Sequence, residues 1–228
     1  MESYYRRASR LAWRLRQEGR PLFWADRPPD GRFFRDGDAL MLWEWRLEFP
    51  PAGRPVAVID LETTGLYPGR DGVTEIAVVR LEGSEKRVFT SFVNPGRPIP
   101  PKVQRITGIT DADVADAPPF EEVLLKAKPL LEDAVWVIQN ASFDLGFLNP
   151  VLSRIGFKID PKVLDTLRVA KRVLPGLRSY RLGHLAEVLA WPGEGFHRAL
   201  ADAEATLWVL HELYYLRANG RLISLEEL

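Results

Sequence analysis

The sequence contains no cysteine in its 228 residues. This absence excludes a disulfide framework, a thiolate zinc site and a cysteine nucleophile together. Long apolar runs are also missing, since runs such as 39–43 and 134–138 are far shorter than the roughly 20 residues that span a bilayer. The first residues lack the apolar region of a signal peptide. We therefore expect a cytoplasmic protein with no membrane partner.

An excess of one charge is missing as well, because 31 Lys and Arg residues balance 31 Asp and Glu residues. This balance excludes a protein held on nucleic acid by bulk positive charge, and also an acidic disordered tail. Residues 1–54 nevertheless hold 11 Arg and 8 acidic residues, whereas the remainder holds 20 basic and 23 acidic residues. Any attraction for a polyanion must therefore be local.

A linker-like run rich in proline, residues 49–55, divides the chain. Before it, helical spacing predicts one helix near residues 4–15, and alternating side chains over 41–49 predict a strand of a small hairpin. The many Arg and Trp residues of this extension leave two roles open, which are packing on the body and contact with a single strand. The predicted domains are an N-terminal extension at 1–54, a main domain at 55–216 and a C-terminal tail at 217–228.

From residue 56 onward the predicted elements alternate in type. Short apolar runs predict strands at 56–60, 74–81, 87–93, 135–139 and 163–166. Helical spacing predicts helices at 120–132, with an interruption or kink at Pro129, and at 143–155, 167–174, 182–190 and 199–218. Three strands followed by strand–helix alternation indicate an α/β fold, with a mixed β-sheet flanked by helices on both faces.

Two carboxylates, Asp60 and Glu62, come at the end of the first predicted strand of this main domain. Residues i and i+2 of a strand lie on the same face of the sheet. Two neighbouring like charges repel, so the pair is costly unless a cation lies between them. The same pair is also compatible with two solvated loop acids, so this motif alone leaves both interpretations open.

Two further segments place an acid at the start of a predicted helix. Asp144 follows an apolar strand and Asn140, and falls in the first turn of a helix. His197 lies in a Gly-rich loop ahead of the last long helix, and Asp202 follows five residues later. Acids near a helix N-terminus also stabilise the helix by capping it and by interacting with its dipole. Capping is therefore the alternative role for Asp144 and Asp202.

Together, the three segments indicate a function more specifically than any one of them does alone. Two parallel strands and one late helix bring their acids toward one edge of the sheet, with a histidine beside them. Carboxylates without any thiolate are the ligands that Mg²⁺ or Mn²⁺ prefers. Such a site can hold two cations about 3.5–4 Å apart. These cations stabilise the attacking and the leaving oxygen of an in-line phosphoryl displacement. The sequence therefore predicts a hard-oxygen metal site at this edge.

At these positions the sequence resembles the DnaQ-like family of 3′–5′ exonucleases, in its branch with four acids and one histidine (DEDDh). The motifs that carry the resemblance are Asp60-x-Glu62 followed by Thr-Thr-Gly, Asn140-x-x-x-Asp144, and His197-x-Ala199-x-x-Asp202. The resemblance covers about residues 55–216 and is greatest for proofreading exonucleases of bacterial DNA polymerase III. It implies a ribonuclease H-like fold. One departure is Gln139, which stands where many relatives have histidine.

The resemblance also implies a role for each matched residue. The carboxylates of Asp60, Glu62, Asp144 and Asp202 would ligate two Mg²⁺ or Mn²⁺ ions. His197 would be the general base that takes the proton of the attacking water. For Phe143, a place in the core is the alternative to stacking on a base, and for Asn140 the alternative is capping a turn. The residues implied to bind the terminal nucleotide are Thr63, Thr64, Gly65, Leu66, Asn140 and Phe143.

We therefore predict a metal-dependent 3′–5′ exonuclease that releases nucleoside monophosphates from single-stranded or frayed DNA 3′ ends in proofreading or repair. A DNA polymerase is a candidate partner. An exonuclease for RNA or short oligonucleotides remains an alternative, because the motifs do not distinguish the 2′ position. A non-catalytic polymerase- or nucleic-acid-binding module would require the loss of one of the five catalytic positions, and all five are present.

Overall fold

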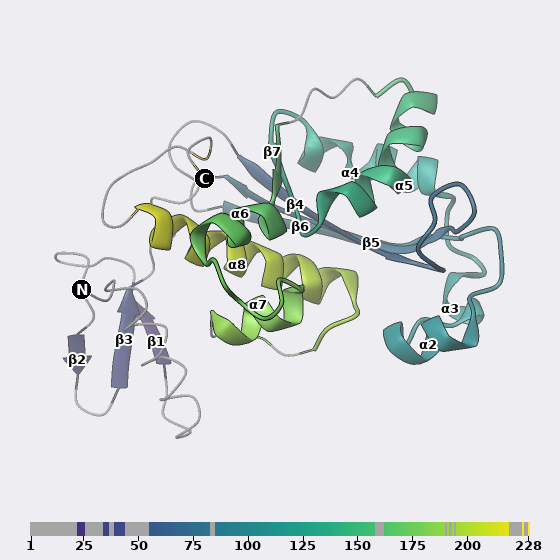
Figure 1. The fold of residues 1–228 in the computed structure, drawn as a ribbon. Helices are drawn as coiled ribbons and strands as arrows, with labels where there is room; N and C mark the ends of the chain where they lie inside the picture. Colours follow the sequence, from purple (N-terminus) through teal and green to yellow (C-terminus); the bar gives the residue numbers. More distant parts are fainter. Residues whose placement is uncertain are drawn as a thin grey trace.

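The computed structural model describes residues 22–25, 34–36, 39–43, 55–82, 85–157, 162–189, 191, 193, 195–218, 225 and 228. Three short strands near the N-terminus form a sheet of their own, in the order β1-β3-β2 (Figure 1). β2 (Phe34–Asp36) and β3 (Ala39–Trp43) pair antiparallel as a hairpin does, while β1 (Leu22–Ala25), which was not predicted, pairs in parallel with β3. The predicted helix near residues 4–15 and the strand residues 44–49 lie outside the described residues.

Five strands form the main sheet, in the order β6-β5-β4-β7-β8 (Figure 1). The first three strands of this sheet along the chain pair antiparallel, whereas β7 pairs in parallel with β4 and β8 in parallel with β7. The predicted mixed sheet is therefore confirmed. The strands are β4 (Val56–Thr63), β5 (Val73–Glu82), β6 (Glu85–Phe92), β7 (Val135–Ile138) and β8 (Val163–Asp165).

Helices cover both faces of this sheet, as predicted (Figure 1). On one face α4 (Phe120–Leu131) and α5 (Ala141–Arg154) pack with Ala57 and Ile59 of β4. Val56 and Val58 of the same strand pack on the other face, because adjacent strand residues point to opposite sides. The helices on that face are α6 (Thr166–Val173), α7 (Leu182–Val188) and α8 (Ala199–Ala218). Burial on both faces explains why the start of β4 is a continuous apolar run.

Two short helices, α2 (Pro101–Thr107) and α3 (Asp111–Val114), were not predicted. Each is at most two turns long, and their small core contains Ile99, Ile109 and Val114, too few apolar side chains to give a helical period. α4 continues through Pro129 to Leu131, so an interruption at this residue is wrong, while a kink there stays a prediction. Among the described residues, no helix is both long enough and apolar enough to cross a bilayer.

β4 extends three residues beyond its predicted end at Asp60. Its whole length pairs with β5, as far as Thr63 opposite Val73, whereas β7 pairs only with residues 56–58 of β4. The second half of β4 therefore has a neighbouring strand on one side only. This arrangement leaves an open edge of the sheet beside Asp60 and Glu62.

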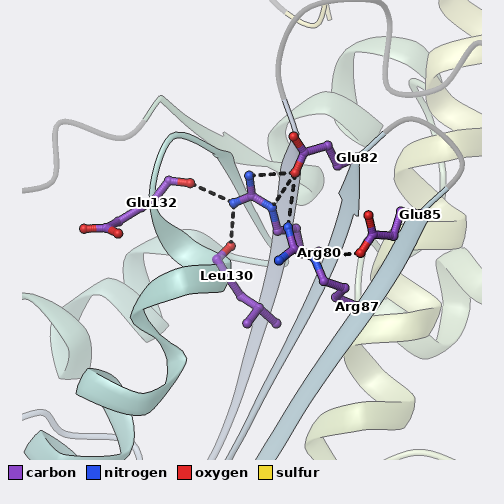
Figure 2. A network of polar contacts seen from close by, with 6 residues as sticks. All are labelled: Arg80, Glu82, Glu85, Arg87, Leu130 and Glu132. Atoms are coloured by element: carbon purple, nitrogen blue, oxygen red, sulfur yellow. Dashed lines mark hydrogen bonds and ion pairs between the residues drawn. The ribbon is translucent and has the colours of Figure 1, made fainter.

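A buried arginine of β5 holds the end of α4 against the sheet. The Arg80 side chain is 8% exposed, and its guanidinium donates to the carbonyl oxygens of Leu130 and Glu132 at 3.1 and 2.7 Å (Figure 2). Its remaining donors bind Glu82 Oε2 at 3.0 and 3.1 Å, and Arg87 also donates to that oxygen, at 3.2 Å. The last carbonyl groups of a helix lack partners within the helix, so Arg80 satisfies groups that would otherwise be buried without one.

We expect Arg80→Met to lower the free energy of unfolding by about 2 kcal/mol, because it leaves carbonyl oxygens and a carboxylate without their donor. Chemical denaturation followed by circular dichroism measures this change. Lys126→Met is the matched control, since it breaks an exposed ion pair with Glu122, a type of pair that contributes about 0–1 kcal/mol. Equal losses in the two variants would contradict the anchoring role of Arg80.

Candidate active site

Three carboxylates meet at the open edge of the main sheet. Asp60 and Glu62 lie two residues apart on one face of β4, and Asp202 approaches them from the first turn of α8. One oxygen atom from each of these side chains lies within 4.8 Å of the other two, and all three residues are half-buried. The acids of the first and third motifs, which are far apart in the sequence, are therefore neighbours in the fold.

A fourth carboxylate, Asp144, lies beside this cluster in the first turn of α5. It is buried, with 4% of its surface exposed. Its side chain is hydrogen-bonded by its own backbone N–H and by that of Leu61 in β4, and its charge acts on Asp60. Asn140, not Asp144, occupies the N-cap position of α5. The contacts of Asp144 thus join it to the acid-bearing strand, which simple capping of α5 would not require.

Burial raises the pKa of all four acids, and the charges of nearby carboxylates raise it further. The pKa of Asp60 lies well above its usual range, first because the group is buried and then because Asp144 and Asp202 are close. Burial, followed by the charge of Asp202, raises the pKa of Glu62 to about 8. Burial likewise raises the pKa of Asp144 to about 8 and that of Asp202 to about 6. Acids this close retain protons near neutral pH unless a cation compensates their charge.

The chemistry of this cluster fits a divalent cation. Asp202 Oδ1 is buried and has no hydrogen-bond partner among the described residues. Leaving a buried carboxylate oxygen without a partner is costly, and a cation bound by the cluster would remove that cost. All the donors are hard oxygens, which suits Mg²⁺ or Mn²⁺ better than soft metals.

His197 lies two residues before the first residue of α8. Its side chain is exposed, and its backbone φ of 66° is in the left-handed region, which histidine adopts more readily than most residues. Its backbone N–H donates to Asp202 Oδ2 at 3.3 Å, which also limits the rise of the Asp202 pKa. This hydrogen bond therefore connects the loop that carries His197 directly to the acid cluster.

A fifth acid, Glu75 of β5, was not predicted. It lies opposite Glu62 in the register of β4 and β5 and is buried. The Arg198 guanidinium donates to its carboxylate at 2.8 and 3.1 Å, and the backbone N–H of Ala199 donates at 3.0 Å. Because Arg198 directly follows His197 and Ala199 begins α8, Glu75 fixes the start of this helix against the sheet.

The sequence did contain a signal for Glu75. A charged residue within an apolar strand needs a partner when both faces of the strand are buried. The identity of that partner, 123 residues further along the chain, could not be found from local patterns. Arg198 also lowers the pKa of Glu62, so it offsets part of the negative charge that Glu75 adds to the site.

The residues predicted to bind a terminal nucleotide lie in the loop after β4 and at the start of α5. The Thr63 hydroxyl donates to the Gly65 carbonyl at 2.7 Å, and the Thr64 hydroxyl accepts from a backbone N–H across the loop at 3.0 Å. A Cβ atom at Gly65 would lie 2.4 Å from the Asp71 carboxylate, so a larger residue there would displace the carboxylate that accepts from the Tyr67 N–H at 2.9 Å. Leu66, by contrast, is 72% exposed, and its side chain is available for a ligand.

The contacts in the structure explain the side chain of Phe143 in part, whereas they give the side chain of Asn140 no capping role. Asn140 adopts a left-handed backbone with φ of 62°, and its N–H donates to Asp165 Oδ1 at 3.2 Å, while its side chain makes no capping hydrogen bond to α5. Phe143 is half-buried and packs on Phe147, with ring centroids 5.3 Å apart. The core interpretation therefore accounts for part of Phe143, and ligand binding by either residue stays a prediction.

Residues 57–210 match the family model RNase_T, which describes an exonuclease. The chain is 38% identical over 159 residues to the 3′-5′ exonuclease DinG of Bacillus subtilis (strain 168). It is 41% identical over 158 residues to the PolC-type DNA polymerase III of Oceanobacillus iheyensis. Each match covers 68% of this chain but only 17% and 11% of the relatives, so the chain spans less than a fifth of their length.

Solved structures of two nucleases are also similar. Exonuclease X in complex with 5′ overhanging duplex DNA has a TM-score of 0.57 and 31% identity, and the match covers 70% of this chain and 90% of that one. E. coli exonuclease I in complex with a dA16 oligonucleotide has a TM-score of 0.60 and 21% identity, covering 72% and 41%. At 21% identity the second likeness shows the fold alone.

We expect the metal-free protein to lose thermal stability as the pH rises from about 5 to about 8. The pKa of both Glu62 and Asp144 is about 8 in the folded state, against a usual value of about 4 for an unfolded chain. Over this window the folded state therefore holds more protons than the unfolded state. The free energy of unfolding then falls as the pH rises. Mg²⁺ or Mn²⁺ should raise the melting temperature most at the upper end of the window.

Melting curves with chelator and with metal, recorded at several pH values, test this expectation. Asp60→Asn should flatten the metal-free profile because it removes one of the repelling charges. Asp116→Asn, which changes an exposed acid, is the control. A metal-free melting temperature that rises over the same window would contradict the raised pKa values.

We expect Glu75→Ala to lower the free energy of unfolding by about 2 kcal/mol, since the Arg198 guanidinium and the Ala199 N–H lose a charged acceptor. Nuclease turnover should fall as well, because His197 directly precedes the segment that Glu75 fixes and Asp202 follows it. Glu75→Gln keeps a neutral acceptor and should lose less of both, whereas Glu85→Ala, on an exposed ion pair, is the control. Full stability and turnover in Glu75→Ala would show that α8 is held without this contact.

Proposed function

Because the chain belongs to the RNase_T exonuclease family, we propose that it is a metal-dependent 3′–5′ exonuclease of the DEDDh type. The observation that carries the proposal is the meeting of Asp60, Glu62 and Asp202 at one edge of the sheet, with Asp144 buried beside them. The proposed reaction is hydrolysis of the last phosphodiester bond of a DNA strand, which releases a nucleoside monophosphate.

Two divalent cations, Mg²⁺ or Mn²⁺, are the proposed cofactors. Their ligands would be the carboxylates of Asp60, Glu62, Asp144 and Asp202. When bound, the cations supply the positive charge that stabilises the attacking and leaving oxygens of phosphoryl transfer. Four raised pKa values and the unpartnered Asp202 Oδ1 support this assignment, because a bound cation would stabilise the charged form of these buried carboxylates and provide a partner for that oxygen.

His197 is the proposed general base, and one of its imidazole nitrogens would take the proton of the attacking water. Its exposed side chain can exchange that proton with solvent, and the hydrogen bond from its backbone N–H to Asp202 keeps it beside the acid cluster. Glu75 and Arg198 would act as positioning residues, since they hold the helix start that follows His197.

The proposed substrate is a single-stranded or frayed DNA 3′ end, in proofreading or repair in the cytoplasm. The exposed side chain of Leu66 and the exposed part of Phe143 are the proposed apolar contacts for the terminal base, next to Thr63, Thr64, Gly65 and Asn140. The complex of exonuclease X with 5′ overhanging duplex DNA supports a DNA substrate. A DNA polymerase is the proposed partner because several relatives are PolC-type polymerases.

A 3′-labelled single strand incubated with Mg²⁺ or Mn²⁺ tests the proposal. We expect stepwise release of mononucleotides, its complete loss with chelator, and its loss in Asp202→Ala, which removes a ligand. His197→Ala should lower turnover by roughly 10²–10⁴-fold, the usual contribution of a general base. Calorimetric titration with Mn²⁺ should show that this variant still binds metal.

His184→Ala serves as the matched histidine control, because His184 lies on α7 and its ring contacts Arg178 and Glu187 rather than the acid cluster. Substantial hydrolysis by folded Asp202→Ala would contradict the metal assignment. Loss of Mn²⁺ binding in His197→Ala would instead place that residue among the ligands. Parallel assays on RNA of the same sequence decide between DNA and the RNA alternative.

A further inference from the structure

Positive charge is concentrated on one part of an otherwise acidic domain. Residues 55–228 hold 20 basic and 23 acidic residues, but the segment 162–189 alone holds six Lys or Arg residues and two acids. The rest of that region therefore holds 14 basic and 21 acidic residues. Five of the six cations are exposed side chains of α6 and the loop after it, and we call these five the α6 surface: Arg168, Lys171, Arg172, Arg178 and Arg181.

The cations of the α6 surface have few acidic partners. Arg168 and Arg178 make only long contacts, at 3.7 Å to Asp165 and 3.6 Å to Glu187. The other three have no ion pair among the described residues. Several exposed cations elsewhere in the described part of the chain are paired with an acid, as in Lys86–Glu204, Lys126–Glu122 and Arg154–Glu121. The α6 surface thus keeps its charge available to an external anion.

A second group of exposed cations also lacks ion pairs among the described residues, but acids in the same stretch balance its charge. It consists of Arg97, which precedes α2, and of Lys102 and Arg105 on α2. The same stretch contains three acids, Asp111, Asp113 and Asp116, which balance its charge. Of these two groups, only the α6 surface therefore lies in a segment with net positive charge.

The α6 surface begins at the candidate active site. Asp165, the N-cap of α6, accepts from the backbone N–H of Asn140 at 3.2 Å and from that of Leu167 at 3.0 Å. The first turn of α6 is thereby joined to the segment that carries Asn140 and Asp144. Arg168, Lys171 and Arg172 are spaced i, i+3 and i+4, so they share one side of α6, which spans about 10 Å from Asp165 to Arg172.

The loop after α6 returns to the same edge of the sheet. Gln139, the residue after β7, donates to the Tyr180 carbonyl at 2.8 Å and accepts from the Thr166 hydroxyl. The Lys171 ammonium lies 5.8 Å from the centre of the Tyr180 ring. Arg178 and Arg181 flank Tyr180 in the sequence, so these contacts bring them toward the cations of α6.

We propose that the α6 surface binds the phosphate backbone of single-stranded DNA on the 5′ side of the terminal nucleotide. The proposal rests on the proposed function, because a 3′ end held at the acid cluster leaves the rest of the strand on its 5′ side. A span of about 10 Å corresponds to about three phosphates of a stacked strand at roughly 3.4 Å each. Such contacts recognise no base, which suits an enzyme that removes nucleotides in succession.

The double variant Lys171→Gln/Arg172→Gln tests the α6 surface. Its matched control is Lys126→Gln/Lys128→Gln, which removes the same charge from exposed positions of α4 on the opposite face of the sheet. Binding of a fluorescent 20-nucleotide strand is measured in chelator at several salt concentrations. Each phosphate contact to a single strand contributes about 0.7 to the salt slope, so the double variant should lower the slope by about 1.4 and weaken binding at low salt about 10-fold or more. The control should keep the wild-type slope.

Turnover provides a second readout. In the double variant, the ratio of kcat/KM for the 20-nucleotide strand to kcat/KM for a dinucleotide should fall about 10-fold, because a dinucleotide is too short to reach the α6 surface. If the wild-type protein binds single strands through this surface but hydrolyses none, the proposed function is refuted. The proposed binding role of the α6 surface would still be supported. A double variant whose slope and turnover ratio equal those of the control would overturn the α6 proposal. Weakened binding to duplex alone, with single-strand binding intact, would overturn it too.

Discussion

The burial of four like charges at one edge of a sheet is the constraint on which the rest of the structure depends. Asp60, Glu62, Asp144 and Asp202 come from a strand and two helices, and each has a raised pKa because burial and its neighbours disfavour its charge. Bringing these groups together opposes folding, so the surrounding contacts must hold the elements in place. A cation-binding site of this kind is stable because the rest of the fold maintains it.

The contacts that maintain the site lie mainly around β4 and β5. β4 is paired with β5 along its whole length but with β7 for only three residues, which opens the edge where the acids lie. Glu75 of β5 then binds Arg198 and the first N–H of α8, so the helix that carries Asp202 starts against the same strand. On the other side of the sheet Arg80 fixes the end of α4. One antiparallel strand thus supports helices on both faces.

A formal net charge of zero is a poor guide to how such a protein meets a polyanion. The acid cluster repels phosphate unless cations are bound, so its attraction depends on metal. The α6 surface carries its positive charge without metal, at the start of a helix joined to the same edge. If the α6 surface binds the strand and the acid cluster cleaves it, as proposed, a domain with excess negative charge can perform both steps.

The sequence by itself determined the mixed sheet, the helices α4 to α8 and the three motifs, because apolar periodicity and local acid spacing are short-range properties. The family resemblance seen in those motifs is confirmed by the match to the exonuclease model. Local patterns could not predict α2 and α3, the extension of β4 to Thr63, or the pairing of Glu75 with Arg198 123 residues away. These features depend on register and on contacts between distant segments. Only the tertiary structure decided which buried charge pairs with which partner, since the interaction energy of such a pair arises when the elements pack together.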